Sequence, residues 1–236
     1  MIQTLPSIVR YSETDESGRL SLPALVDYFQ DAAELHGDRL GIGWRYLAEQ
    51  HLAWLLSSWQ IEIGRLPELS EEILVKTWGW KFQSIFGMRN SLLLDKDGNT
   101  LVTANSVWFL YDTQAQKPVR VPENVVNAFG VHPKADMKYA PRKLPDIEGG
   151  QTMESLTVGL QNLDTNHHVN NAQYVAMAME CLPRGIKPVE LLVEYKKQAY
   201  LGDIITPVVQ RTEDGYAISL RASGGDPYAN LRLRTG

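Results

Sequence analysis

The chain has little that would place it outside a reducing, aqueous compartment. Among its 236 residues there is one cysteine, Cys181, so an intramolecular disulfide is excluded. No apolar run approaches the roughly 18 residues that a membrane-spanning helix needs. The first segment, MIQTLPSIVRYSETDESG, lacks the basic stretch followed by an apolar stretch that marks a secretory signal. We therefore expect a soluble, cytoplasmic protein that does not act at a membrane.

Positive charge is also scarce. The chain carries 23 Lys and Arg against 28 Asp and Glu, a net charge of −5, whereas general nucleic-acid binding needs a basic surface that displaces counterions from phosphate. The H-E-x-x-H and C-x-x-C metal motifs, the phosphate-binding glycine loop and the G-x-S-x-G turn of serine hydrolases are all absent. We expect no nucleic acid, no metal and no cofactor.

The pattern of the first half predicts one helix followed by antiparallel strands. Residues 22–40 place seven side chains at helical spacing, with Ser21 as N-cap and Gly41 as stop. The seven are Leu22, Leu25, Val26, Phe29, Ala33, His36 and Leu40. Apolar and β-branched residues then predict strands over residues 55–63, 72–80, 86–94 and 100–112, with Asp97-Gly98 as a hairpin turn. Together they define a first module, residues 1–112.

Residues 113–150 lose this periodicity and predict a long connection that contains one short helix around residues 122–129. Its prolines are Pro118, Pro122, Pro133, Pro141 and Pro145. The pattern restarts in a second module, residues 151–236. There we expect a strand over residues 153–160, a helix from about Asn171 to Cys181, and strands over 189–197, 203–209, 216–222 and 228–234. Asp214-Gly215 predicts a further turn.

The two modules repeat in residues as well as in element order. The segment from Thr14 aligns with the segment from Leu163, and the segment from Ile61 aligns with the segment from Val193. The matched pairs are Asp15 with Asp164, Leu20 with Val169, Glu62 with Glu194, Leu69 with Leu201, and Glu71 with Asp203. We therefore expect an α+β protein of two modules, each with an antiparallel sheet wrapped around a central helix.

The segment DTNHHVNN, residues 164–171, concentrates an acid, two histidines and three asparagines directly before the second helix. One interpretation is a turn with an N-cap at Asn170 or Asn171, where these residue types are common. The other is a hydrolytic site. Unpaired N–H groups at the helix start would polarise an acyl carbonyl, and a histidine with a carboxylate would handle the proton of water. The residues alone leave both interpretations open.

This segment resembles the D-x-N-x-H-V-N-N-x-x-Y motif of the bacterial and plant acyl-acyl carrier protein thioesterases, and every fixed position matches from Asp164 to Tyr174. In the first half, YSETDESGRLSLPALVDYFQDAAELHGDRLG, FGMRN and SVWFLYD are similar to the same family. The resemblance implies a double hot-dog fold with the active site mainly on the second module. It assigns catalytic roles to Asp164, Asn166 and His168, and it leaves His167 at a variable position.

One position departs from the pattern of that family. Where the family usually has a glutamate, this chain has Gln198, and the cysteine of the plant members is replaced by Ala199. A glutamine can orient a water or a histidine but cannot accept a proton as a carboxylate does. Gln198 stays a fourth candidate catalytic residue, while general-base work falls to His168 or Asp164. Attack on the thioester by water and attack by Asp164 both remain open.

The resemblance implies hydrolysis of fatty acyl-acyl carrier protein, which releases a free fatty acid and ends chain elongation. The alternatives are an acyl-CoA thioesterase of the same fold and a non-catalytic acyl-binding or regulatory protein, the latter motivated by Gln198. The expected partner is an acidic acyl carrier protein, which basic clusters would steer if they are more than solvated surface. These clusters are Lys134, Lys138, Arg142 and Lys143, and Lys196 with Lys197. A homodimer is one open assembly.

Other reactive or aromatic side chains are expected to be structural. Cys181 lies on the apolar second helix and predicts a buried thiol, and His36 on the first helix predicts a hydrogen-bonded core residue. All six tryptophans lie in the first half, where core packing accounts for most of them and an acyl channel is the alternative for the rest.

Overall fold

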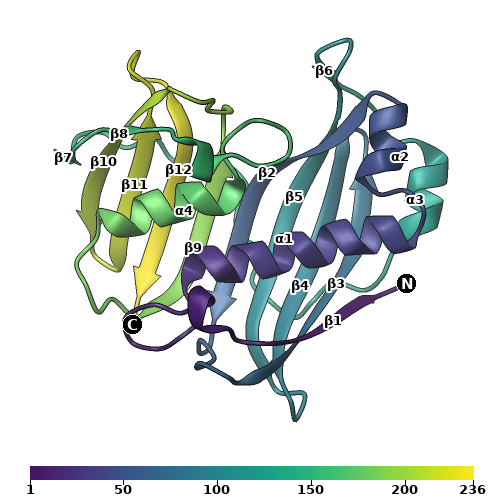
Figure 1. Cartoon of the computed structure of the whole chain (residues 1–236), viewed down its shortest axis with the longest axis horizontal. Coiled ribbons are helices and arrows are strands. Elements are labelled where there is room, and N and C mark those ends of the chain that lie inside the picture. Colours follow the sequence, from purple (N-terminus) through teal and green to yellow (C-terminus); the bar gives the residue numbers. More distant parts are fainter. The chain divides into compact units, whose positions relative to one another are not determined.

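The computed structural model describes all residues, 1–236, which form two compact units. Unit 1 comprises Met1–Ser57 and Ile61–Ala140, and unit 2 comprises Ser58–Gln60 and Pro141–Gly236. In each unit, one long helix lies against a sheet, α1 in the first and α4 in the second (Figure 1). None of the helices combines the length and the apolar character needed to cross a membrane.

The helix α1, Leu22–Arg39, is the centre of unit 1. The Ser21 hydroxyl caps it by accepting the N–H of Ala24 at 3.4 Å, and a proline occupies the first turn, where its missing N–H removes no helical hydrogen bond. Leu25, Val26 and Phe29 are fully buried, and each such side chain contributes about 1.5–3 kcal/mol on burial. The predicted helix is confirmed, although Ala32 takes the buried position expected for Ala33.

Five of the longer strands lie wholly or mainly in unit 1, in the order β1-β3-β4-β5-β2. They are β1 (Gln3–Ile8), β2 (Leu52–Ile63), β3 (Glu72–Gln83), β4 (Phe86–Asp95) and β5 (Thr100–Asp112). The four predicted strands are confirmed. The first strand is additional, and its Pro6 is tolerated because β1 lies at the end of the strand order and pairs only with β3.

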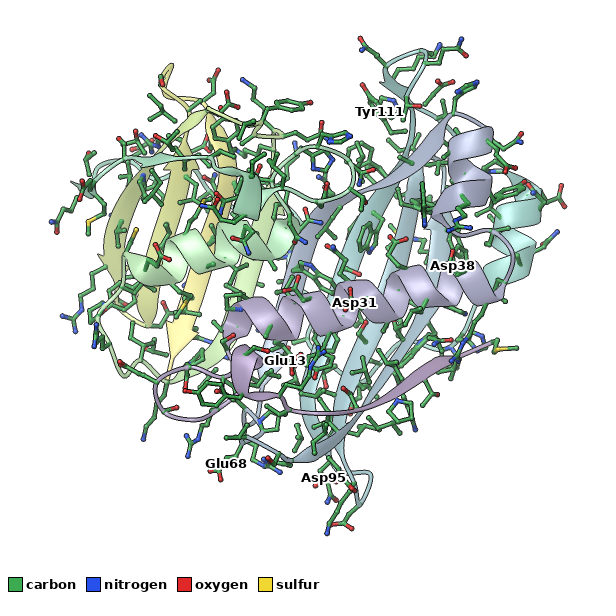
Figure 2. All side chains as sticks on the ribbon, in the orientation of Figure 1. Glu13, Asp31, Asp38, Glu68, Asp95 and Tyr111 are labelled. Atoms are coloured by element: carbon green, nitrogen blue, oxygen red, sulfur yellow. The ribbon has the colours of Figure 1, made fainter.

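The turn between β4 and β5 is held by Asp95, which is labelled at the strand ends in Figure 2. Its carboxylate accepts the N–H groups of Asp97 at 3.0 Å and Asn99 at 2.8 Å. Gly98 adopts a φ of 85°, which a glycine reaches without steric cost. The expected Asp97-Gly98 turn is therefore confirmed, and an aspartate two residues upstream organises it.

The connection after β5 is fastened to unit 1 over much of its length. It forms β6 (Lys117–Pro118), which pairs with β5, and α3 (Glu123–Phe129), which confirms the expected short helix. Trp78 then donates its indole N–H to the Pro133 carbonyl at 2.8 Å, and the Tyr139 hydroxyl donates to Asn90 Oδ1 at 2.8 Å. A short helix, α2 (Trp44–Glu49), follows α1 in the same unit.

Unit 2 repeats the arrangement with one helix and four longer strands. The helix α4 spans Asn171–Glu180, as predicted. The strands are β9 (Pro188–Tyr195), β10 (Ile204–Thr212), β11 (Gly215–Arg221) and β12 (Pro227–Thr235), which together with β7 follow the order β9-β12-β11-β10-β7. Neighbouring strands in this series pair antiparallel. These four predicted strands are confirmed.

The strand expected over residues 153–160 is wrong as a continuous element. The structure has two short pieces instead, β7 (Gln151–Thr152) and β8 (Leu156–Thr157), both paired with β10. Between them β10 carries Pro207, which has no N–H to donate to a neighbouring strand. A hydrogen bond of 2.8 Å between the Ser155 and Thr206 hydroxyls occupies the gap. The proline therefore divides the strand.

Candidate active site

The segment that holds three of the candidate residues is a tight loop, residues 163–170, called here the Asp164 loop. An isolated bridge between Leu163 and Val169 closes it. Inside it, Asp164 N–H donates to the His168 carbonyl at 2.9 Å, and His167 N–H donates to the Asp164 carbonyl at 3.0 Å. His167 adopts a φ of 63°, in the left-handed region. The side chain of Asp164 completes the turn, because its Oδ1 accepts the Asn166 N–H at 2.8 Å.

The same turn brings Asp164 and His168 together. His168 Nδ1 lies 3.5 Å from Asp164 Oδ2, and the two side chains are 13% and 15% exposed. This separation is longer than a strong hydrogen bond, but contacts of this kind often tighten when a substrate binds. The carboxylate therefore has two distinct tasks: Oδ1 shapes the loop and Oδ2 faces the imidazole. Asn166 is exposed at the tip of the loop.

The start of α4 corrects one expectation about the site. Asn170 is the N-cap, and its Oδ1 accepts the Ala172 N–H at 2.8 Å. The Gln173 N–H donates to the Asn170 carbonyl at 2.9 Å. Two of the helix's first N–H groups are thus already engaged by the capping residue, which satisfies donors that would otherwise be free. Polarisation of an acyl carbonyl by these two groups is excluded.

Gln198 lies in the segment that follows β9, and this segment contacts the Asp164 loop directly. The Val169 N–H donates to the Ala199 carbonyl at 2.9 Å. His168 and Gln198 are each one residue away from that bond. The half-buried Gln198 side chain accepts the Tyr200 hydroxyl on its Oε1 at 3.0 Å. The structure therefore brings all four candidate residues to one end of α4.

Unit 1 contains a loop with the same backbone path directly before α1, residues 14–21, called here the Asp15 loop. Three of its hydrogen bonds have direct counterparts in the Asp164 loop. The bond from Asp15 N–H to the Arg19 carbonyl (2.8 Å) matches the bond from Asp164 N–H to the His168 carbonyl (2.9 Å). The bond from Gly18 N–H to the Asp15 carbonyl (3.0 Å) matches the bond from His167 N–H to the Asp164 carbonyl (3.0 Å). The bond from Ser17 N–H to Asp15 Oδ1 (2.8 Å) matches the bond from Asn166 N–H to Asp164 Oδ1 (2.8 Å). The predicted alignment of Asp15 with Asp164 is confirmed.

The two loops have different side chains at the positions of the candidate catalytic residues His168 and Asn166. Arg19 stands at the position of His168, and Ser17 stands at the position of Asn166. Arg19 reaches instead towards Glu68, with Nη2 3.8 Å from Oε1; Glu68 is labelled near the lower ends of the unit 1 strands in Figure 2. The second predicted alignment is also confirmed, because Leu20 N–H donates to the Pro67 carbonyl at 2.8 Å as Val169 does to Ala199. It places Leu66 at the position of Gln198.

Comparison with known proteins decides the family. Models of the acyl-ACP thioesterase N-terminal domain and C-terminal domain match residues 6–129 and 147–232. The chain belongs to the acyl-ACP thioesterase family. Among curated relatives, the chloroplastic palmitoyl-acyl carrier protein thioesterase of Arabidopsis thaliana is 25% identical over 247 residues, which cover 97% of this chain and 60% of that protein. The chloroplastic dodecanoyl-[acyl-carrier-protein] hydrolase of Cinnamomum camphora is 23% identical and covers 84% of this chain and 56% of its own length. The chain thus spans little more than half the length of these relatives.

Solved structures confirm the double hot-dog fold of this acyl-ACP thioesterase family member. An acyl-ACP thioesterase from Bacteroides thetaiotaomicron superposes with a TM-score of 0.92 at 22% identity and covers all of this chain and 98% of its own. The 12:0-ACP thioesterase from Umbellularia californica gives a TM-score of 0.85 at 22% identity, with coverage of 100% and 97%.

Cys181 and His36, which the sequence predicts to be structural, lie outside the site. Burial raises the pKa of the Cys181 thiol, whose Sγ donates to the Met177 carbonyl. His36 is buried, and its Nδ1 lies 3.0 Å from Nη1 of the buried Arg89. Burial and the charge of Arg89 lower the pKa of His36 to about 3. Arg89 was not anticipated, although an arginine inside the apolar strand FGMRNSLLL could have pointed to it.

The basic clusters of the acyl-ACP thioesterase chain are partly engaged within it. Lys134 Nζ lies 4.2 Å from the ring centroid of Trp80 and 4.1 Å from that of Tyr139, a cation–π arrangement that fastens the connection. Lys196 Nζ contacts Asp146 Oδ1 at 2.8 Å, and Lys197 Nζ lies 5.5 Å from the Tyr228 ring centroid. Of these lysines, Lys196 is therefore paired with a carboxylate, whereas Lys134 and Lys197 keep their charge next to neutral rings.

Proposed function

We propose that this chain hydrolyses the thioester of fatty acyl-acyl carrier protein, releases the free fatty acid and so ends chain elongation. The observation that carries the proposal is the Asp164–His168 pair, with 3.5 Å between Oδ2 and Nδ1. It lies in a loop whose counterpart in unit 1 keeps the backbone and has no histidine. Family membership and the names of the relatives, which act on acyl-acyl carrier proteins, support the same reaction.

In the proposed reaction, His168 is the general base. Its Nδ1–H donates to Asp164 Oδ2, so Nε2 is the nitrogen that accepts a proton from water. The water oxygen bonds to the thioester carbonyl carbon as Nε2 takes that proton. The tetrahedral intermediate then collapses, the C–S bond breaks, and the imidazolium returns the proton to the leaving sulfur. The products are a fatty acid and the thiol of the carrier.

The remaining candidates take supporting roles in this proposal. The Asn166 amide, exposed at the tip of the loop, positions the water or donates to the carbonyl oxygen as negative charge develops on it. Gln198 orients the water through its amide, because it cannot act as a base. Both oxygens of Asp164 are already engaged, one by the Asn166 N–H and one by His168. This arrangement supports water rather than Asp164 as the attacking group.

Replacement of His168 tests the assignment. His168→Ala should lower kcat for release of the carrier thiol by about 10²- to 10⁴-fold, the usual cost of losing a general base. The matched control is His167→Asn, because asparagine tolerates the left-handed φ of 63° at this exposed position. The control should keep near-normal kcat, and both variants should unfold as the wild type does. Near-normal turnover in His168→Ala would sink the assignment.

Substrate and partner are settled by a second experiment. We propose an acyl carrier protein as partner and expect higher kcat/KM on acyl-acyl carrier protein than on the acyl-CoA of the same chain length. The reverse order would make the chain an acyl-CoA thioesterase. Saturable acyl-thioester binding without thiol release would instead identify a non-catalytic acyl-binding protein, which the glutamine at position 198 favours.

The assignment of parts follows the same proposal. Residues 151–236 form the module that carries the chemistry, residues 1–112 form the first module, and residues 113–150 connect them. A cytoplasmic location is proposed on the single cysteine, Cys181, which is free. A homodimer is the assembly to test against a monomer, by sedimentation of the purified chain.

A further inference from the structure

A buried tyrosine on α4 holds the peptide group next to Gln198. Tyr174 is 3% exposed, and its hydroxyl oxygen accepts the Ala199 N–H at 2.9 Å. The Ala199 carbonyl accepts the Val169 N–H, also at 2.9 Å. Ala199 is therefore hydrogen-bonded on both sides: its N–H donates to Tyr174 on α4, and its carbonyl accepts from the Asp164 loop.

The position of the Tyr174 hydroxyl is itself fixed by packing. Its ring meets the ring of Tyr195 edge-on, with 5.7 Å between centroids, and the Tyr195 hydroxyl donates to the Asn171 carbonyl on the first turn of α4 at 3.0 Å. Burial raises the pKa of Tyr174, so its hydroxyl stays neutral at physiological pH. A rigid neutral oxygen is thus presented to the Ala199 N–H.

Unit 1 shows that the fold does not need this hydrogen bond. The alignment of the two helix caps, Ser21 with Asn170, places Leu25 at the position of Tyr174, and Leu25 is fully buried. Pro67 stands at the position of Ala199. Unit 1 keeps the hydrogen bond to the carbonyl, because the Leu20 N–H donates to the Pro67 carbonyl at 2.8 Å. It has no counterpart of the bond from the Ala199 N–H to Tyr174, because a proline has no N–H and a leucine side chain has no acceptor.

Both partners of the Tyr174–Ala199 bond are thus present in unit 2, which has His168, and absent from unit 1, which has Arg19 at the matching position. Of the polar groups compared in the two units, those shared by both shape the loop, as Asp15 and Asp164 do. Those confined to unit 2 are His168, Asn166, Gln198 and the Tyr174–Ala199 pair. A hydrogen bond that only the chemically equipped unit keeps is better explained by the site than by the fold.

We propose that Tyr174 is a positioning residue, which fixes the segment that carries Gln198 against the Asp164 loop and so sets the Gln198 amide relative to His168. The rest of the segment is anchored beyond it, since the Tyr200 N–H and the Tyr228 hydroxyl both donate to Asp203 Oδ2, at 2.9 Å and 3.0 Å. Tyr174 fixes the start of the segment, at Ala199. This inference rests on the proposed function.

Tyr174→Phe tests the inference, because it keeps the ring and removes only the hydroxyl that accepts the Ala199 N–H. We expect kcat to fall about 10- to 100-fold, the scale of a displacement of roughly 1 Å at a reacting centre, with KM changed less than about threefold. In addition, Gln198→Ala and the double variant Tyr174→Phe/Gln198→Ala should have equal kcat within about twofold, since Tyr174 acts through Gln198.

The matched control is Tyr28→Phe, which removes another buried tyrosine hydroxyl from a central helix. Tyr28 is 5% exposed on α1, and its hydroxyl contacts Glu13 Oε2 at 2.7 Å. It should lower stability and leave kcat unchanged. A Tyr174→Phe enzyme with wild-type kcat, or with losses that simply multiply those of Gln198→Ala, would overturn the inference. Absence of thiol release by the wild type itself would overturn the proposed function and this inference together, so the two failures are distinguishable.

Discussion

Asp164→Asn is the substitution that most directly separates the two tasks of Asp164. Asparagine keeps an Oδ1 that can accept the Asn166 N–H, which lies 2.8 Å from Asp164 Oδ1 in the wild type, so the loop should keep its conformation. It replaces Oδ2, 3.5 Å from His168 Nδ1, with an NH₂ group that can only donate. Nδ1 must then accept a hydrogen bond, which moves the ring proton to Nε2. An Nε2 that already carries a proton cannot take one from water.

The expected loss follows from that tautomer change. Removal of a working general base costs about 10²- to 10⁴-fold in kcat, or roughly 2.7 to 5.4 kcal/mol of transition-state free energy. The free energy of unfolding should change by less than about 0.5 kcal/mol, because no buried contact is lost. Steady-state release of the carrier thiol measures the first quantity, and denaturant unfolding measures the second.

The structure supplies the control for this experiment. Asp15→Asn makes the same change in the Asp15 loop, where Oδ1 accepts the Ser17 N–H at 2.8 Å and Arg19 replaces the histidine. We expect wild-type kcat in that variant. Equal losses in Asp15→Asn and Asp164→Asn would show that both aspartates act through loop structure. A normal kcat in Asp164→Asn would show that Asp164 does not set the tautomer of His168.

Two further predictions concern other groups. Gln198→Glu should raise kcat, because a carboxylate there can accept a proton; the rate of thiol release across pH 6 to 9 checks it, and an unchanged rate would mean that the glutamine is not limiting. His36→Gln should reduce the fall in the free energy of unfolding as the pH drops below 6.5. The folded state lowers the pKa of His36 from 6.5 to about 3 through burial and Arg89, so the unfolded state binds the proton first, and stability falls between those values by at most about 1.4 kcal/mol per pH unit. Denaturant unfolding at pH 7 and pH 5 measures the difference between wild type and variant. Asp27, whose pKa is raised to about 6 mainly by burial, acts in the opposite direction in both proteins and cancels in that difference.

The parts of the fold that local rules govern could be predicted from the sequence. The helices α1 and α4 begin at Ser21 and Asn170, whose side chains accept backbone N–H groups, and the two apolar faces follow helical spacing. The residue alignment also anticipated that the Asp15 and Asp164 loops share one backbone path. These features depend on neighbours within a few positions along the chain, where single-sequence patterns carry information.

Features that depend on partners far along the chain could not be predicted. Pro207 divides the expected strand over residues 153–160 because β10 happens to lie beside it. The Arg89–His36 pair joins β4 to α1 across 53 positions, and no local pattern of either segment specifies the other. One local detail also stayed open, because the sequence offered Asn170 and Asn171 as caps of α4. The structure shows that Asn170 is the cap and that its side chain accepts the Ala172 N–H.

The duplication separates residues that shape the fold from residues that could act on a substrate, without any other sequence. Where the two units share a group, as at Asp15 and Asp164, a structural task explains both copies, namely the hydrogen bond from the N–H two residues later. A group found in one unit needs another explanation. His168 against Arg19 and Gln198 against Leu66 are differences of this kind, and so is the Tyr174–Ala199 bond. They gather around one end of α4, although they come from two separate stretches of chain, residues 168–174 and residues 198–199. A single site on unit 2 accounts for their common position.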